Sequence, residues 1–440
     1  MRIVLADCYH DSDKGGGGIV GGALKTIYVA CKKHNCQPDI YLIYRFSEDD
    51  PRFASAARLT LKTFPDVKVL PAPISSRRGP GLHWLSWAFK VFCIGSLRII
   101  LPQTSRHKAV QAIRKADIII YKGGHFYRSW SKKALVDLVA LYILTFPLLL
   151  ARRLHKRYCL LSHSFGPFNR KTSELIIRFA LEKCAYLSCR ESISKNILLQ
   201  CGLDEQKVHV TCDLAFAAFE TTDDRIAKIL ARYKLKHQEY VAVTSRPWFQ
   251  KQRSRGIETA YQDYIENMAA LCDYVIEDKK KKIALVLQND GAHSTNEPDI
   301  IPLGDIFNNI KHKESVVILK EDFAFDELVS IYAHALLTIG TRLHSCIFSF
   351  VGGTPSIAVA YSHKAEGIMH MMGADRFLLD IEKLSVSEGR KMIDQIITKR
   401  ADLSEDYQRR VAELRSELYK AIEKTLFSEK TVNKNYYESE

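Results

Sequence analysis

Short runs of apolar residues alternate with longer amphipathic segments along almost the whole chain. The short runs are typical of strands buried on both faces of a parallel sheet. They predict strands at 1–6, 39–44, 116–124, 157–162, 186–189 and 208–211, and then at 240–244, 283–288, 316–319, 337–339 and 356–359. Apolar residues at helical spacing predict helices at 23–34, 260–279, 326–334, 345–351 and 404–426. Alternation of the two kinds of element indicates the α/β class.

The alternation occurs twice, on either side of a polar segment at 220–227 that we interpret as a linker between domains. We expect two doubly wound, Rossmann-like α/β domains that face each other across a cleft, a GT-B-like arrangement. The first domain spans 1–220, the second spans 228–400, and a C-terminal helix and tail occupy 401–440. Ligands of open parallel sheets bind beyond the carboxyl ends of the strands, so the site is expected in the cleft.

A cluster of glycines follows the first predicted strand. It comprises Gly15 to Gly18, Gly21 and Gly22, and it precedes the helix predicted at 23–34. Strand, glycine turn and helix is the opening of a nucleotide-type α/β unit. The cluster lacks the Lys-Ser/Thr ending of a P-loop, so a loop that cradles an anion and a merely flexible turn fit it equally well.

The composition indicates a globular protein with sizeable cores, since 47% of the 440 residues are hydrophobic and 26% are charged. Eleven cysteines are scattered without paired C-x-x-C spacing, which argues against a zinc ribbon and favours a reducing compartment. One basic residue before a short apolar run is typical of a buried first strand and not of a secretory signal. We therefore expect a cytoplasmic protein.

The net charge of +14 is unevenly distributed. No acidic residue lies within 67–116, and we interpret about 71–115 as an inserted segment in which basic residues interleave with aromatic and aliphatic ones. No nucleic-acid-binding module is recognisable, so nucleic acid is not an expected partner. An anionic membrane surface, at the inner face of the membrane, is a candidate partner for such a segment.

A second apolar stretch, 134–151, reaches about the lower length limit of a membrane span and is followed by basic residues. Asp137 and Pro147 interrupt it. A helix buried against a sheet fits this pattern, and so does a monotopic surface on anionic lipid. Both fit it better than a true span.

The segment 330–367 carries the most chemical information. It is predicted to run from a helix through the strand at 337–339 to Thr341, Arg342, Leu343 and His344, which precede another helix. A guanidinium, an imidazole and the free N–H groups of a helix start together suit a phosphate or carboxylate. The alternative is that Arg342 pairs with a buried carboxylate and His344 caps a helix.

The order of these elements resembles the C-terminal signature of the polysaccharide pyruvyl transferases. The match consists of R-L-H at 342–344, G-x-P at 353–355, and Tyr-x-x-Lys with Tyr361 and Lys364. Earlier similar elements are Tyr-Lys-Gly-Gly at 121–124, Ser-His-Ser-Phe-Gly-Pro at 162–167, Arg-Glu-x-x-Ser at 190–194 and Asp-Leu-Ala-Phe at 213–216. The resemblance covers roughly 118–367. His163 stands where the family commonly has Gln, and the N-terminal glycine cluster departs from the family's Asn-x-Gly-Asp-like element.

The resemblance implies transfer of pyruvate from phosphoenolpyruvate to a sugar diol of a polysaccharide or lipid-linked glycan precursor, with formation of a pyruvate ketal. It implies catalytic roles for Arg342 and His344, with the second domain on the phosphoenolpyruvate side and the first on the acceptor side. It also implies substrate contacts for Lys364, Gly123, Gly124 and His163. The scheme requires neither a metal nor a cofactor.

Three alternatives stay open at this point. Arg246, after the strand at 240–244, is a candidate second cation for the donor carboxylate, or a solvent-facing loop residue. A GT-B-type glycosyltransferase that uses a nucleotide sugar is the main alternative function, with Glu327 and Phe325 as candidate nucleotide contacts. A non-catalytic, membrane-bound assembly protein with the same fold is the third.

Overall fold

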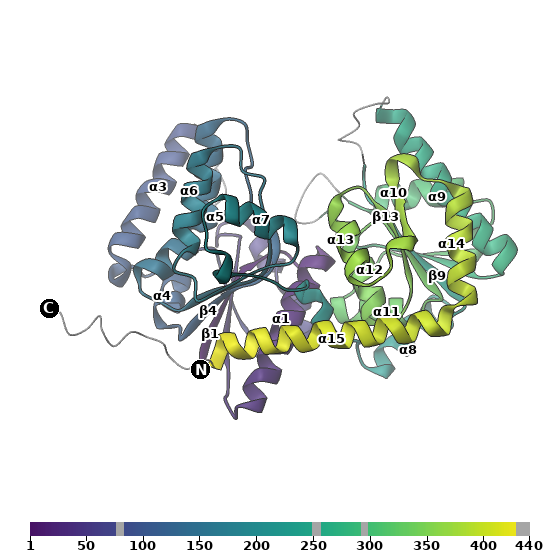
Figure 1. Ribbon diagram of the computed structural model, residues 1–440, viewed down its shortest axis with the longest axis horizontal. Helices are drawn as coiled ribbons and strands as arrows, with labels where there is room; N and C mark the ends of the chain where they lie inside the picture. Colours follow the sequence, from purple (N-terminus) through teal and green to yellow (C-terminus); the bar gives the residue numbers. More distant parts are fainter. Residues whose placement is uncertain (76–82, 249–256, 292–297, 428–440) are drawn as a thin grey trace.

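The chain folds around two parallel β-sheets that lie side by side in the computed structural model (Figure 1). The structure describes residues 1–75, 83–248, 257–291 and 298–427. In the first sheet the strand order is β3-β2-β1-β4-β6-β7-β8, and β5 also pairs with β6. Its strands are β1 (Arg2–Cys8), β2 (Asp39–Tyr44), β3 (Lys68–Leu70), β4 (Ile118–Tyr121), β5 (Gly124–Tyr127), β6 (Tyr158–Phe165), β7 (Tyr186–Cys189) and β8 (Val208–Val210).

The second sheet repeats this winding, with the order β11-β10-β9-β12-β13-β14. Its strands are β9 (Tyr240–Thr244), β10 (Lys282–Val286), β11 (Val316–Leu319), β12 (Leu337–Gly340), β13 (Ser356–Ala360) and β14 (Leu378–Asp380). In both sheets the first strand lies in the middle and the chain winds outwards first to one side and then to the other. This is the doubly wound order, and it confirms the expected pair of Rossmann-like sheets in a GT-B-like fold.

Helices cover both faces of the sheets. They are α1 (Lys14–Lys33), α2 (Arg58–Thr63), α3 (Trp84–Ile100), α4 (Lys108–Lys115), α5 (Ala134–Arg153), α6 (Lys171–Leu181), α7 (Ser192–Gln200), α8 (Asp223–Arg232), α9 (Ile257–Lys279), α10 (Ile300–Asn309), α11 (Phe325–Ala333), α12 (Leu343–Val351), α13 (His363–Met371), α14 (Val386–Thr398) and α15 (Arg400–Phe427). Alternate residues of β1 show the two layers. Ile3 and Leu5 belong to the core that includes α1, while Val4 and Ala6 belong to the core that includes α4 and α5.

The predicted glycine turn is wrong, because α1 begins at Lys14 and includes the whole glycine cluster. Gly15, Gly18 and Gly21 recur at intervals of three and share one face of this helix. A β-carbon on them would overlap His344, Phe348 and Phe325 of the second half of the chain, respectively. The cluster therefore allows α1 to approach α11 and α12 closely, at a cost in helix propensity that the contact must offset.

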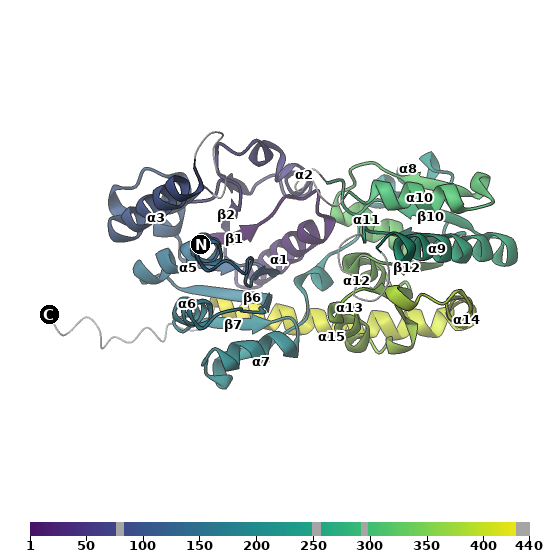
Figure 2. The same ribbon diagram turned by 90° about the horizontal axis from the view of Figure 1, so that it is seen from above.

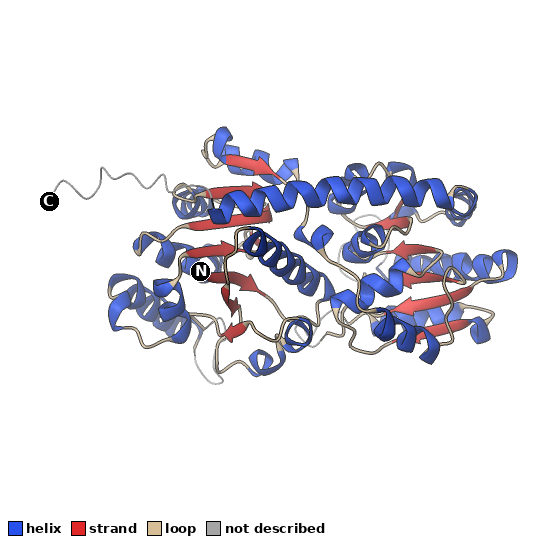
Figure 3. Ribbon diagram, turned by 90° about the horizontal axis from the view of Figure 1, so that it is seen from below, coloured by secondary structure: helices blue, strands red, loops and turns tan. Residues whose placement is uncertain are grey.

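The last helix, α15, ties the two sheets together and crosses beneath both of them in Figures 1 and 3. Its Arg415 donates from Nε to the carbonyl of Phe216 at 2.8 Å and from Nη2 to that of Ala218 at 2.6 Å. Glu423, near its end, accepts from Lys33 at 2.9 Å and pairs with His34 at 2.7 Å, both at the end of α1. Residues 428–440 of the predicted tail lie outside the described residues.

The apolar stretch that follows the basic segment forms α5. Within the described ranges it is the helix that is long and apolar enough to cross a membrane, yet 56% of its apolar window is buried inside the protein. Asp137 in its first turn accepts hydrogen bonds from the Ser129 and Ser173 hydroxyls at 2.9 and 3.0 Å. Most of α5 is thus a packed core helix. The inserted segment forms α3 and α4, and its Arg77 and Arg78 lie outside the described residues.

Candidate active site

Two arginines follow the two neighbouring strands at which the second sheet changes winding direction. Arg246 lies two residues after β9 and Arg342 two residues after β12. The connections that follow these two strands leave on opposite sides of the sheet. Open α/β sheets bind their ligands at such an edge, beyond the carboxyl ends of the strands. The Arg246 guanidinium lies over the ring of Tyr361, 4.0 Å from its centroid. Tyr361 follows the next strand, β13, so three consecutive strand ends of the sheet supply this part of the site.

Arg342 is held by a buried carboxylate. Its Nε lies 3.0 and 3.1 Å from the two carboxylate oxygens of Asp299, and its Nη2 also donates to Asp299. Burial raises the pKa of the Asp299 carboxyl to about 6, although Arg342 and Arg246 act in the opposite direction. The structure therefore has the buried ion pair that sequence reasoning kept as the alternative for Arg342, and this pair fixes the guanidinium at the strand end.

His344 lies in the first turn of α12, against the first turn of α1. The N-cap residue of α12 is Arg342, and no side chain caps this helix. Nε2 of His344 is 3.8 Å from Oδ2 of Asp213, and it is a buried atom without a hydrogen-bond partner among the described residues. Burial lowers the pKa of His344, while Asp213 and Asp13 oppose that shift. The site thus presents a buried, unpaired imidazole nitrogen.

Lys122 is a buried cation that sequence reasoning did not single out. It follows β4, and only 1% of its surface is exposed. Its ammonium interacts electrostatically with Asp7, Asp13 and Asp213, and burial lowers its pKa. Within the described part of the chain it makes no hydrogen bond through its side chain. The sequence does contain a signal for Lys122, because it is a lysine directly after a wholly apolar strand. Buried charges are retained only where they are paired or used, so a lysine in such a position is a candidate site residue.

The middle family-like elements meet in one hydrogen-bond network beneath His344. Arg190 donates from Nη1 to Asp213 at 2.7 Å and from Nε to the Ser164 hydroxyl at 2.6 Å. Its Nε is also 3.4 Å from a carboxylate oxygen of Glu191. Burial opposes ionisation of Asp213, but Arg190, His344 and the backbone N–H of Ala215 together outweigh it, so the pKa of Asp213 is lowered. Arg190 thus keeps the Asp213 carboxylate ionised next to the imidazole.

Lys364 links the second domain to the first. It lies in the first turn of α13, and its Nζ is 2.7 Å from Nδ1 of His125 in β5. Nε2 of His125 is 2.7 Å from the carbonyl oxygen of Gly166, which assigns the proton to Nε2 and the acceptor role to Nδ1. Burial, followed by Arg190, lowers the pKa of Lys364 to about 7. Burial also lowers the pKa of His125, to about 3, so this imidazole is neutral.

The remaining predicted residues are placed differently. His163 is completely buried in β6, where its Nε2 bonds the carbonyl of Tyr121 at 3.1 Å, so it does not join the cluster. Gly123 and Gly124 form the turn between Lys122 and β5. A β-carbon on Gly123 would lie 2.6 Å from the carbonyl oxygen of Ser162, and Gly124 has a φ of +155°. These glycines fit the turn closely beside β6, and Lys122 is the charged group that the turn carries.

These placements bring a cluster of cations together where the two domains meet. Arg246, Arg342 and Lys364 come from the second domain, and Lys122 and Arg190 come from the first. Across the described ranges, no group of three His, Cys, Asp or Glu side chains is arranged to hold a metal ion. Guanidinium and ammonium groups at strand ends, beside the start of α12, suit a small ligand with several negative charges.

Comparison with known sequences matches residues 31–363 to the family described as polysaccharide pyruvyl transferase. The amylovoran biosynthesis protein AmsJ of Erwinia amylovora is 25% identical to the chain over 431 residues, which cover 96% of each protein. The match therefore extends over almost the full length of both chains.

Comparison with solved structures finds proteins of similar fold. HepE of Anabaena in complex with UDP is 14% identical, with a TM-score of 0.53 over 96% of this chain and 99% of HepE. The UDP-GlcNAc 2-epimerase of Methanocaldococcus jannaschii is 14% identical, with a TM-score of 0.56 over 94% of this chain and 100% of the epimerase. At these identities the likeness is one of fold, and it agrees with the GT-B-type arrangement of the two sheets.

Proposed function

This chain belongs to the polysaccharide pyruvyl transferase family, and we propose that it transfers pyruvate from phosphoenolpyruvate to a sugar diol of a glycan precursor. The observation that carries the proposal is the set of cations at three strand ends of the second sheet. Arg246, Arg342 and Lys364 lie there, and the unpaired Nε2 of His344 belongs to the first turn of α12, two residues after Arg342. Phosphoenolpyruvate carries a phosphate and a carboxylate on three carbons, so it needs several cations within a small space.

The proposed reaction forms a ketal. The methylene carbon of phosphoenolpyruvate takes up a proton and becomes a methyl group, which leaves C2 with oxocarbenium character. One sugar hydroxyl bonds to C2 and loses its proton, and a second hydroxyl does the same as the bond from C2 to the phosphate oxygen breaks. Of the two protons released, one balances the proton taken up by carbon and the other leaves on inorganic phosphate. The protein must position both substrates and exchange these protons.

We assign donor binding to Arg342, Arg246 and Lys364. Asp299 keeps Arg342 in a fixed orientation through Nε and Nη2. Lys364, whose pKa is about 7, is able both to bind an anion and to supply a proton near neutral pH. His344 is neutral in the free protein, since burial lowers its pKa, and we assign to it a hydrogen bond to the donor phosphate. A bound dianion would raise that pKa again.

The glycosyltransferase alternative loses its two candidate nucleotide contacts. Glu327 accepts from Lys62 at 2.9 Å, from Arg225 at 2.6 Å and from its own helix start. Phe325 is buried against Gly21 in the contact between α11 and α1. Both side chains are therefore used in packing, so neither is available to a ribose or base. The UDP in the HepE complex is a ligand of HepE and supplies no nucleotide contact for this chain.

We place the acceptor on the first domain and propose that a membrane presents it at the cytoplasmic face. Exposed apolar residues follow one face of α3 at helical spacing (Leu85, Phe89, Cys93, Leu97 and Ile100). The opposite face, with Ala88, Val91 and Gly95, is buried. Lys90 flanks the apolar face and Arg106 is exposed close to its end. An apolar face flanked by positive charge fits an anionic lipid surface. Figure 2 shows α3 at the outer end of the first domain.

The reaction itself provides the test. The purified protein is incubated with phosphoenolpyruvate and glycan precursors extracted from the producing cells, and inorganic phosphate and pyruvylated product are measured by phosphorus NMR and mass spectrometry. We expect phosphate release that depends on the precursors and is absent with Arg342→Ala. Release of nucleotide from an added nucleotide sugar, with phosphoenolpyruvate unchanged, would replace pyruvyl transfer by glycosyl transfer.

A further inference from the structure

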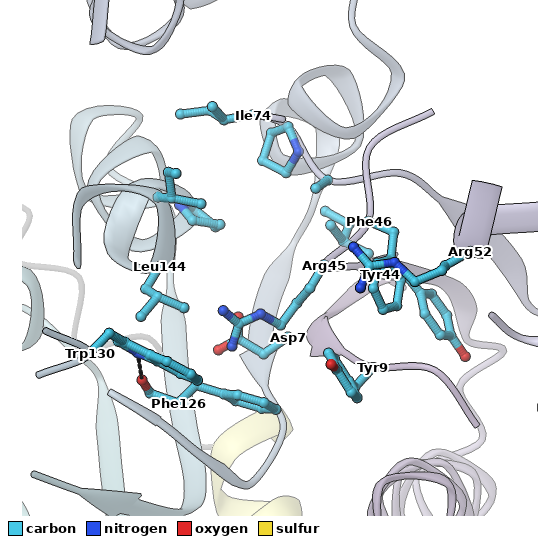
Figure 4. A pocket seen from close by; sticks show the side chains of 15 residues that line it. Asp7, Tyr9, Tyr44, Arg45, Phe46, Arg52, Ile74, Phe126, Trp130 and Leu144 are labelled. Carbon is cyan, nitrogen blue, oxygen red and sulfur yellow. Dashed lines mark hydrogen bonds between the residues drawn. The ribbon is translucent and has the colours of Figure 1, made fainter. Parts of the chain in front are cut away.

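A cavity of about 210 Å³ lies in the first domain, at the carboxyl ends of β1 and β2 (Figure 4). Its polar floor is formed by Asp7 and Arg45, and Figure 4 shows both side chains at its centre. The remaining lining is aromatic, aliphatic or proline, apart from Arg52. The aromatic residues are Tyr9, Tyr44, Phe46, Phe126 and Trp130, and the others are Ile43, Ala72, Pro73, Ile74, Ile143, Leu144 and Pro147.

Arg45 is the reason to expect a ligand. Its Nη1 is buried without a hydrogen-bond partner among the described residues, and its guanidinium lies 4.2 Å from the centroid of the Phe126 ring. The second arginine of the cavity is different, because Arg52 donates to both carboxylate oxygens of Asp50, at 2.9 and 2.6 Å. A guanidinium nitrogen withdrawn from water without a hydrogen bond is costly, and a ligand oxygen bonded to this nitrogen would remove that cost.

Asp7 supplies the complementary acceptor. One of its carboxylate oxygens accepts from the Tyr127 hydroxyl at 2.6 Å. Its backbone has a φ of +62°, which is uncommon for a residue other than glycine. Such a backbone conformation persists where the surrounding structure stabilises it. The opposite charges of Asp7 and Arg45 interact. A floor with one donor and one acceptor group and little net charge favours a neutral ligand with several hydroxyl groups.

The aromatic walls of the cavity fit the C–H faces of such a molecule. Tyr9 lies 5.2 Å from Phe46 and 6.0 Å from Phe126, ring centre to ring centre, so the rings form a continuous aromatic surface. Trp130, 48% exposed, stands at the rim, with its indole N–H donated to the carbonyl of Phe126 at 3.1 Å. Aromatic faces contact the C–H faces of a sugar ring, while buried polar groups hydrogen-bond its hydroxyls.

The cavity borders the proposed donor site. The Phe126 ring that faces Arg45 is also 5.4 Å from Nζ of Lys122. Lys122 interacts electrostatically with His344 across the cleft. Asp7 and Lys122 follow paired positions of the neighbouring strands β1 and β4, where Ala6 lies opposite Tyr121. Phe126 and Lys122 therefore connect the cavity to the surroundings of His344.

We propose that this cavity binds one neutral, hydroxyl-rich sugar ring of the acceptor glycan, with Arg45 and Asp7 bonding its hydroxyls and the aromatic walls contacting its C–H faces. Binding of a sugar ring is a property of the cavity by itself. Its identification as an acceptor ring rests on the proposed function.

Saturation-transfer NMR with the full-length protein tests the proposal. The probes are the neutral methyl glycosides of glucose, galactose and mannose, methyl glucuronide as a charged probe, and cyclohexylmethanol as an apolar ring with a single hydroxyl. We expect a neutral glycoside to bind and the other two classes to bind less well. Arg45→Met should weaken that binding by about tenfold or more, because it removes a charge-assisted hydrogen bond. Arg52→Met, which removes the arginine that Asp50 already pairs, should leave it within about twofold.

Trp130→Ala at the exposed rim is a second variant that leaves the core untouched, and it should also weaken glycoside binding. The proposal is overturned if no neutral glycoside binds, if the glucuronide or cyclohexylmethanol binds best, or if Arg45→Met and Arg52→Met behave alike. Phosphoenolpyruvate binding, measured on the same samples, separates the two proposals. If a glycoside binds and phosphoenolpyruvate does not, pyruvyl transfer is contradicted and the sugar cavity stands. If phosphoenolpyruvate binds and no glycoside does, the sugar cavity is contradicted and pyruvyl transfer stands.

Discussion

Gly15 leaves the space into which the imidazole of His344 fits. A β-carbon at this position of α1 would overlap that ring, whose Nδ1 would lie only 2.2 Å away. The contact joins the first helix of one domain to the first turn of a helix in the other. The sequence left open whether the glycine cluster cradles an anion or is a flexible turn, and the structure instead makes it part of the support for the imidazole.

Gly15→Ala is expected to lower turnover by about tenfold or more, because His344 must leave its position by a distance that matters to catalysis. Gly17→Ala is the matched control, since its β-carbon would meet Asp11 at an ordinary 3.7 Å. Gly17→Ala should keep activity and raise the free energy of unfolding by about 0.5–1 kcal/mol through better helix propensity. Steady-state kinetics and urea denaturation measure both effects. Equal activities for the two variants would remove Gly15 from the site.

Arg342→Ala is expected to abolish transfer and to destabilise the protein by up to about 3–5 kcal/mol, because Asp299 loses its partner in a buried position. Arg342→Lys should also be nearly inactive, since an ammonium cannot replace the planar contact with Asp299. The double variant Arg342→Ala, Asp299→Asn removes the lone carboxylate and should recover much of the stability without recovering activity. Recovery of both properties in the double variant would show that Arg342 acts only on the fold.

Phosphoenolpyruvate affinity is expected to fall as pH rises through about 7, the pKa of Lys364 in the free protein. Below that pH the ammonium is present and binds the anion, and above it the protein must take up a proton in order to bind. The dissociation constant should then increase by up to about tenfold per pH unit. Lys364→Arg keeps its charge over the whole range and should give a flat profile in the same calorimetric titration. A wild-type profile that is equally flat would exclude Lys364 from the donor site.

The exposed apolar face of α3 predicts binding to vesicles rich in anionic lipid, which sedimentation with the vesicles measures. The double variant Phe89→Ser, Leu97→Ser should lose most of this binding without loss of folding, because Phe89 is 72% and Leu97 is 58% exposed. The matched control is Ile300→Ser, Ile301→Ser on α10 in the second domain, which changes another exposed apolar pair, at 40% and 49% exposure. Binding that is insensitive to the α3 variant, or equal with neutral vesicles, would contradict a role for this face.

The strands were the most predictable part of the fold, because buried parallel strands appear in a sequence as short apolar runs. The bounds of β2, β7, β9 and β11 agree with the predicted runs at 39–44, 186–189, 240–244 and 316–319. The outer strands β3 and β14 were missed, since three residues of mixed exposure carry too little pattern. The glycine helix was missed because glycine disfavours helix locally, and only the surface of the other domain explains it.

The candidate site was predictable where its residues follow strands, and less so where they depend on distant partners. Arg246, Arg342, His344 and Lys364 stand within four residues of the ends of β9, β12 and β13. Asp299 and Arg342 are 43 positions apart in the sequence. Residue spacing does not predict an ion pair over such a separation. His163 has the residue type of a ligand-binding group, yet its strand is buried on both faces, so it lies within the sheet.

The central claim is that this cluster of cations is a phosphoenolpyruvate site, and calorimetric titration of the full-length protein tests it most directly. Phosphoenolpyruvate, UDP-glucose and UDP-GlcNAc are titrated separately into the wild type, Arg342→Ala and Gly17→Ala. We predict binding of phosphoenolpyruvate to the wild type and Gly17→Ala, with a loss of about a hundredfold or more in Arg342→Ala. Binding of a UDP-sugar with no binding of phosphoenolpyruvate, or phosphoenolpyruvate binding that Arg342→Ala leaves unchanged, would contradict it.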